Sequence, residues 1–119
     1  TIYMNPSKRQ FILYLEDILM SIEKIQDYIH GLEYIEFKEK SIAQDAVIRN
    51  FEIIGEAAKN IPIEIANKYP NIPWKKMYAM RNIITHEYFG IDLEIIWEII
   101  KNELPDNYDQ IKIAITSEQ

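Results

Sequence analysis

Cysteine is absent from this sequence of 119 residues. Its absence excludes disulfide bridges, thiolate metal ligands and cysteine nucleophiles, and it fits a reducing compartment. No stretch approaches the roughly 18 apolar residues of a membrane span, and no basic segment followed by a long apolar run opens the chain. We therefore expect a cytoplasmic protein with no membrane-embedded part.

Glycine and valine are also scarce, with three Gly and one Val, and no segment alternates apolar and polar residues over many positions. The single valine and the lack of alternation disfavour a β-sheet. Isoleucine, in contrast, occupies 25 positions, and 48% of all residues are apolar. The length and composition predict a single all-α domain over residues 1–119 that hydrophobic burial holds together.

The spacing of apolar residues predicts an antiparallel bundle of four main helices with short extra helices. The first helix has Pro6 in its first turn and Gly31 just after its end, and its apolar stripe is either core or a dimer seam. Residues 33–40 form either a linker or the start of a second long helix that runs to about Asn60. Gly55 inside that helix indicates close packing, because a mid-helix glycine costs about 1 kcal/mol relative to alanine.

Proline, glycine and aspartate divide the second half of the chain. We expect a short helical turn over 62–69, a main helix over about 74–89 that stops at Gly90, a further helix capped by Asp92 and ended by Leu104 and Pro105, and a final short helix from Asp106 with a frayed tail over 116–119.

The formal net charge of −6 disfavours binding to nucleic acid through overall charge, but the charge is unevenly distributed. Residues 1–58 carry −4 and residues 87–119 carry −6, whereas residues 59–81 contain five basic side chains and one acidic one, a net charge of +4. The five basic residues are Lys59, Lys68, Lys75, Lys76 and Arg81. A local positive face is therefore possible on an acidic molecule.

Groups suited to proton or phosphate chemistry are few, with two His and three Arg, and they gather near Arg81, Asn82, His86 and Tyr88. On a helix, Arg81 and Tyr88 share a face, while His86 lies about 140° from Arg81. One chain alone would form a loose site, but a two-fold dimer of this helix would bring two Arg and two His into one cleft. Histidine as general base and arginine at the developing charge suit metal-independent cleavage of RNA through its 2′-hydroxyl.

Each candidate also has an ordinary structural explanation. His86 could cap a helix or lie in the core, and Arg81 could form a surface ion pair. Glu52 and Glu56 could be a carboxylate pair, but a solvated face or a salt bridge from Glu56 to an arginine is the simpler interpretation. With no histidine ligands nearby, we predict no metal site.

Five further residues are notable for their type. Arg49 and Asn50 lie in an otherwise apolar helix, and a buried arginine there would need a partner such as Glu52, Glu56 or a group across a dimer. Trp74 and Trp97 are interpreted as core anchors in preference to base-stacking platforms. His30, beside Gly31, complements the end of a helix dipole.

The segment from Arg81 to Tyr88 closely resembles the Arg-x-x-x-x-His-x-Tyr motif of the HepT group of HEPN toxins, the ribonuclease components of HEPN/MNT toxin–antitoxin pairs. The resemblance covers about residues 8–112 and includes several blocks in order. These blocks are residues 49–58, the proline turn with Tyr69, Pro70, Ile72, Pro73 and Trp74, and Asp92, Trp97, Leu104 and Pro105 downstream.

This resemblance implies an all-α HEPN bundle that acts as a metal-independent endoribonuclease without a cofactor. Arg81 and His86 would be the catalytic pair of a site formed across a homodimer, and Asn82 would orient that pair or the RNA. Tyr88 would be the tyrosine that a partner MNT nucleotidyltransferase modifies with AMP to silence the toxin. Homodimers could assemble with that partner into a larger hetero-complex.

Two other functions stay open on the sequence. The chain could be a non-catalytic helical subunit that docks the nucleotidyltransferase, with the motif building an interface. It could also be a helical domain that binds free nucleotides. Cleavage activity separates the first hypothesis from both alternatives.

Overall fold

The computed structural model describes residues 6–86 and 92–119, with side chains for residues 7–82 and 92–119. Within these ranges all regular structure is helical, as predicted. The helices are α1 Pro6–Ile29, α2 Tyr34–Glu39, α3 Ser41–Lys59, α4 Ile63–Lys68, α5 Trp74–His86, α6 Leu93–Asn102 and α7 Leu104–Glu118.

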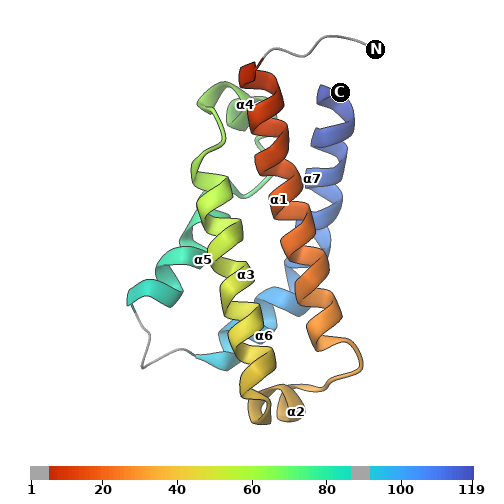
Figure 1. Ribbon diagram of the computed structural model, residues 1–119, viewed down its shortest axis with the longest axis vertical. Helices are drawn as coiled ribbons and strands as arrows, with labels where there is room; N and C mark the ends of the chain where they lie inside the picture. The colour runs from red at the N-terminus through yellow and green to blue at the C-terminus, as the bar shows by residue number, and fades with distance from the viewer. Residues whose placement is uncertain (1–5, 87–91) are drawn as a thin grey trace.

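The bundle is built around α1, which lies between α3 and α7 and runs antiparallel to both (Figure 1). Helix α5 packs on α3, and α6 packs on α7. The predicted apolar stripe of α1 is buried within one chain, so it is core and not a dimer seam. Its six residues are Phe11, Leu15, Ile18, Ile22, Ile25 and Ile29. Each contributes roughly 1.5–3 kcal/mol of burial free energy before the entropy of ordering is counted.

Residues 33–40 are neither a plain linker nor the start of the second long helix, because they contain a separate short helix, α2, that ends before α3 begins at Ser41. Gly31 has φ of +76°, the left-handed conformation that ends a helix, which confirms its predicted role. The Glu33 backbone N–H then donates to the Glu36 carboxylate at 3.0 Å and caps α2. Phe37 of α2 is fully buried, so this short helix closes one end of the core.

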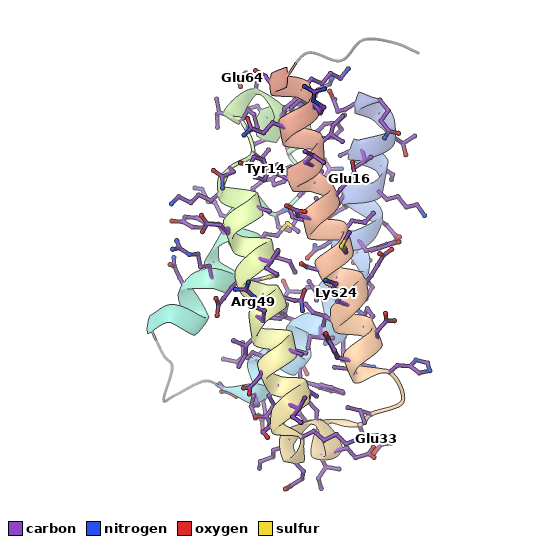
Figure 2. All side chains as sticks on the ribbon, viewed as in Figure 1. Tyr14, Glu16, Lys24, Glu33, Arg49 and Glu64 are labelled. Carbon is purple, nitrogen blue, oxygen red and sulfur yellow. The ribbon has the colours of Figure 1, made fainter. Side chains whose placement is uncertain are left out.

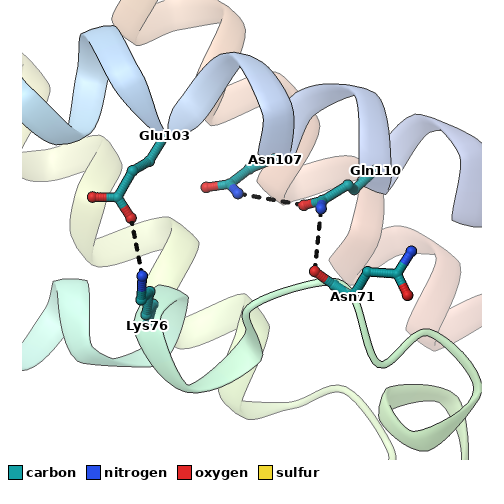
Figure 3. Close-up of polar contacts among 5 residues, drawn as sticks. All are labelled: Asn71, Lys76, Glu103, Asn107 and Gln110. Atoms are coloured by element: carbon teal, nitrogen blue, oxygen red, sulfur yellow. Dashed lines mark hydrogen bonds and ion pairs between the residues drawn. The ribbon is translucent and has the colours of Figure 1, made fainter.

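Side chains of Gln110 on α7 and of Glu103 just before it hold the loop before α5 and the first turn of α5 in place (Figure 3). Gln110 Nε2 donates to the Asn71 carbonyl at 3.1 Å, and Lys76 Nζ lies 3.8 Å from Glu103 Oε1. The indole N–H of Trp74 donates to backbone carbonyls of the α4 segment. Helix α5 therefore starts from a fixed position.

The C-terminal region differs from the sequence prediction in two ways. Helix α6 ends at Asn102, and Leu104 begins α7 with Pro105 in its first turn, because proline fits that position. The expected frayed tail is wrong, since α7 continues to Glu118. Glu118 is buried and accepts hydrogen bonds from Lys68 Nζ at 2.7 Å and the Tyr69 hydroxyl at 2.5 Å.

No helix in residues 6–86 and 92–119 is both long enough and apolar enough to span a membrane.

Candidate functional site

Arg81 of α5 lies directly against Gly55 of α3. A Cβ built on Gly55 would lie 2.6 Å from Arg81 Cβ and 2.9 Å from Arg81 N, closer than side-chain and backbone atoms can approach. Only a residue without a side chain therefore allows α3 and α5 to come this close. The predicted tight packing at Gly55 is confirmed, and its partner is the first residue of the predicted catalytic motif.

The next residue of α3, Glu56, forms an ion pair with the Arg81 side chain. Arg81 Nε lies 3.2 Å from Glu56 Oε2, and the two side chains are 39% and 52% exposed. The sequence interpretation of Glu56 as the partner of an arginine is confirmed. Since both groups are hydrated, the pair adds little to folding stability but gives the guanidinium group a preferred direction.

Arg81 and Glu56 line one side of a surface pocket of about 420 Å³ between α1, α3 and α5. Figure 2 shows Tyr14 on α1 and Arg49 on α3, which line the same pocket. The lining residues are Tyr14, Asp17, Arg49, Glu52, Ile53, Glu56, Ala57, Asn60 and Arg81. The pocket thus places two arginines and three carboxylates around one opening at the surface.

Arg49 is exposed and so needs no buried partner, and Asn50 is the buried polar residue of the two. Asn50 Nδ2 donates to the Ala46 carbonyl at 2.8 Å, and its Oδ1 has no hydrogen-bond partner among the described residues. The outward position of Arg49 brings a second cation to the pocket. Tyr14 and Asp17 also line it, and nothing in the sequence set them apart from the other residues beside the core stripe of α1.

The remaining motif residues lie in the last turns of α5 or beyond its end. Asn82 is exposed, and His86 is the last residue of the helix. Helical geometry places the His86 backbone about 7.5 Å further along the axis than Arg81 and about 140° around it. The predicted modification site, Tyr88, lies outside the described residues. The structure thus positions Arg81 in detail and His86 through its backbone.

The basic residues between 59 and 81 do not form a continuous positive face. Lys68 pairs with Glu118, Lys76 with Glu103 and Arg81 with Glu56. Each carboxylate comes from one of the acidic segments that flank this stretch in sequence. Folding therefore offsets much of the local positive charge, and an anionic ligand would meet separate arginines instead of a broad basic surface.

The structure also shows the surroundings of the three other candidate residues, Trp74, Trp97 and His30. Trp74 is half-buried and hydrogen-bonded, and Trp97 is half-buried with its ring centroid 5.3 Å from that of Phe37. Both tryptophans therefore anchor the core, as predicted. His30 is exposed just after α1, which agrees with its interpretation as a helix-end residue. Among the described residues, His, Asp and Glu side chains form no group of three or more that could hold a metal ion.

A family model described as "Ribonuclease HepT-like" matches residues 18–114, a range that contains Gly55, Glu56, Arg81 and His86. The chain belongs to the HepT-like ribonuclease family. The family resemblance predicted from the sequence is thereby confirmed. All the pocket-lining residues of α3 and α5 lie inside the matched range, whereas Tyr14 and Asp17 precede it.

Three relatives illustrate this membership in the HepT-like family. "Putative RNase MJ0127" of Methanocaldococcus jannaschii is 42% identical over 108 residues, which cover 91% of this chain and 89% of the relative. "Putative RNase MJ1380" of the same organism is 40% identical over 108 residues, with 91% and 99% coverage. "Probable ribonuclease HepT" of Thermococcus cleftensis is 42% identical over 98 residues, with 82% and 89% coverage. No solved structure gives a significant match.

Proposed function

We propose that this HepT-like chain is the toxin component of a HEPN/MNT toxin–antitoxin system and acts in the cytoplasm as a metal-independent endoribonuclease. One observation carries the proposal. The chain belongs to a ribonuclease family, and its helix α5 holds Arg81 at the edge of a pocket and continues to His86, five residues later. Residues 1–119 would form a single HEPN domain.

His86 would act as general base and remove the proton from a ribose 2′-hydroxyl. The freed oxygen attacks the adjacent phosphorus, a 2′,3′-cyclic phosphate forms, and the 5′-oxygen leaves. Arg81 would stabilise the negative charge that develops on the phosphate oxygens. Asn82, which is exposed one residue after Arg81, would orient the RNA or the catalytic pair.

A homodimer would complete the site. Within one chain, the backbone positions of Arg81 and His86 lie about 140° apart around α5. A two-fold axis beside this helix brings each histidine near the other chain's arginine, and the second His86 can then protonate the leaving oxygen. The exposure of Asn82 is compatible with such an approach.

Cleavage of an RNA oligonucleotide by the purified full chain in EDTA tests this proposal. We expect the wild type to cleave and His86→Ala to lose about 100-fold or more in rate, as is typical of a general base. His30→Ala is the matched control, because it removes the chain's other histidine from an exposed position. Helical circular dichroism of both variants should equal that of the wild type.

Undiminished cleavage by His86→Ala would remove this residue from the mechanism. A wild-type chain that binds the partner nucleotidyltransferase but cuts no RNA would support the alternative function of a docking subunit. Tight binding of free nucleotide by such an inactive chain would instead support a nucleotide-binding domain.

Silencing would occur at Tyr88 by transfer of AMP from ATP, catalysed by the MNT nucleotidyltransferase. An AMP group two residues after His86 adds bulk and negative charge where an RNA phosphate must bind. Mass spectrometry after incubation with ATP and the partner should locate AMP on Tyr88. Tyr88→Phe should abolish the modification, and Tyr28→Phe, at an exposed tyrosine of α1, should not. Modification elsewhere or nowhere contradicts this mode of silencing.

A further inference from the structure

Two successive residues of α3 contact the same residue of α5, one at its backbone and one at its side chain. Gly55 lies against the N, Cα and Cβ atoms of Arg81, and Glu56 lies 3.2 Å from its Nε. The first contact sets how closely α5 approaches α3. The second sets the direction of the guanidinium group.

We propose that Gly55 and Glu56 together position Arg81 for transition-state stabilisation, with Glu56 as a positioning residue that does not itself touch the RNA. This inference rests on the proposed ribonuclease function. It adds to that function two residues from outside the motif of residues 81–88, Gly55 and Glu56, on which the geometry of the reaction depends.

The backbone contact fixes the base of the Arg81 side chain. Since any Cβ at position 55 would lie within 3 Å of Arg81 N and Cβ, a larger residue must push α5 outward. The neighbouring α5 residues Met77 and Met80 are buried, so the helix cannot rotate freely about this contact. Arg81 therefore leaves α5 at a defined point on the pocket edge.

The side-chain contact fixes the plane of the guanidinium group. The Glu56 carboxylate forms an ion pair with Nε and favours one direction of the guanidinium group over others. With the carboxylate at Nε, we expect a phosphate to be bound through the terminal nitrogens. Two parallel hydrogen bonds from Nη1 and Nη2 match the geometry of two phosphate oxygens.

Glu56 should affect catalysis more than binding. Its negative charge offsets part of the Arg81 charge, so it does not favour binding of the ground-state phosphate. Glu56 would instead lower the energy of the transition state. When negative charge builds up on the phosphate oxygens, the guanidinium group is already oriented toward that charge and need not reorganise. We therefore expect a change in kcat with little change in KM.

Steady-state cleavage by Glu56→Ala and Glu56→Gln tests this split. Glu56→Ala should lower kcat at least about tenfold, because small errors in the placement of a catalytic group are costly, and should leave KM nearly unchanged. Glu56→Gln keeps an acceptor oxygen for Nε and should retain most of kcat. Glu16→Ala and Glu16→Gln, at an exposed glutamate of α1 (Figure 2), are the matched controls and should behave as wild type.

A double-mutant cycle shows whether Glu56 acts through Arg81. In an Arg81→Lys background there is no Nε to hold, so Glu56→Ala should cause no further loss. An equal loss in both backgrounds overturns the inference, as does an unchanged or raised kcat for Glu56→Ala alone.

The contact can also be measured without activity. The chain contains three arginines, so an NMR spectrum of arginine Nε–Hε groups has three signals, and Arg81→Lys identifies one of them. Glu56→Ala and Gly55→Ala should both shift that signal and leave the other two in place. If the wild type cuts no RNA, the proposed function is wrong whatever the spectrum shows. If the Arg81 signal does not shift in Glu56→Ala, the contact between Glu56 and Arg81 is absent and the present inference is wrong.

Discussion

The two ends of α5 are built differently although they belong to one helix. At the N-terminal end, Trp74 is hydrogen-bonded, Met77 and Met80 are buried, and Lys76 pairs with the start of α7. At the C-terminal end, Arg81 is half-exposed and packs on α3, and Asn82 is exposed. Figure 1 shows this end of α5 extending away from the bundle.

Under the proposed function, this difference lets a small helical protein hold Arg81 firmly and still expose it to a large substrate. Burial at one end supplies the rigidity, because packed side chains cannot shift independently. At the other end Arg81 is half-exposed and Asn82 is exposed, so under the proposed function they can meet RNA or a second copy of the chain. Substitutions at the two ends should therefore separate stability from activity.

Met77→Ala should have the largest effect on stability. Met77 is fully buried, so its truncation leaves a cavity and should lower the free energy of unfolding by about 2–5 kcal/mol. Arg81→Ala removes the hydrated ion pair with Glu56 and should cost less than Met77→Ala, about 1 kcal/mol. Urea unfolding followed by circular dichroism measures both.

RNA cleavage should show the reverse order at a temperature where both variants are folded. Arg81→Ala should lose about 100-fold in rate through the missing electrostatic stabilisation, and Met77→Ala should lose much less. Similar losses of activity for the two variants would mean that the ends of α5 are not separate in function.

Glu118→Gln tests the anchoring of the loop before α5, with an intermediate effect. Hydrogen bonds from Lys68 and Tyr69 hold the pKa of the Glu118 carboxyl below its ordinary value of 4.5. A carboxyl with a lowered pKa stabilises the fold above its unfolded pKa, and this contribution is lost as the pH falls through its folded pKa. Glu118→Gln should therefore cost about 1–2 kcal/mol near pH 7 and progressively less below pH 4.5.

Unfolding free energies of wild type and Glu118→Gln across this pH range check the sign. A difference that grows as the solution becomes more acidic would contradict the assignment. RNA cleavage by Glu118→Gln at neutral pH should stay close to wild type, because Glu118 lies on α7 and not on the pocket.

Lys76→Ala should have the smallest effect on the free energy of unfolding. Its ammonium group is 3.8 Å from Glu103, and the Lys76 side chain is 75% exposed, so the loss should be below about 0.5 kcal/mol. Thermal unfolding in low and high salt measures it, and salt should reduce the difference further. A loss as large as that of Met77→Ala would show that polar contacts, and not burial, anchor this end of α5.

Much of the fold could be read from local patterns. The stripe of α1, the left-handed Gly31 and the Asp92 cap each depend on residues within a few positions of one another, and all three are present. The errors occurred where distant segments meet. The tail at 116–119 was expected to fray because nothing near it in sequence holds it, yet Lys68 and Tyr69 bind Glu118 from about 50 positions away.

The site divides in the same way. The sequence alone identified Arg81, Asn82, His86 and Tyr88 as candidates, and Gly55 as an unusual mid-helix glycine. Rare residue types and motif spacing can be recognised without a structure. The sequence could not decide that Arg49 faces outward while Asn50 faces inward. That choice depends on how α3 is turned between α1 and α5, which follows from the packing of all three helices.

The sequence by itself determined that the chain is helical, where most helices begin and end, and that it belongs with the HepT-like ribonucleases. These properties follow from short-range periodicity and from motifs. Only the tertiary structure decided that Gly55 and Glu56 meet Arg81 and that much of the basic segment is paired with carboxylates. Such contacts join residues far apart in the chain, and the packing of whole helices against one another selects them.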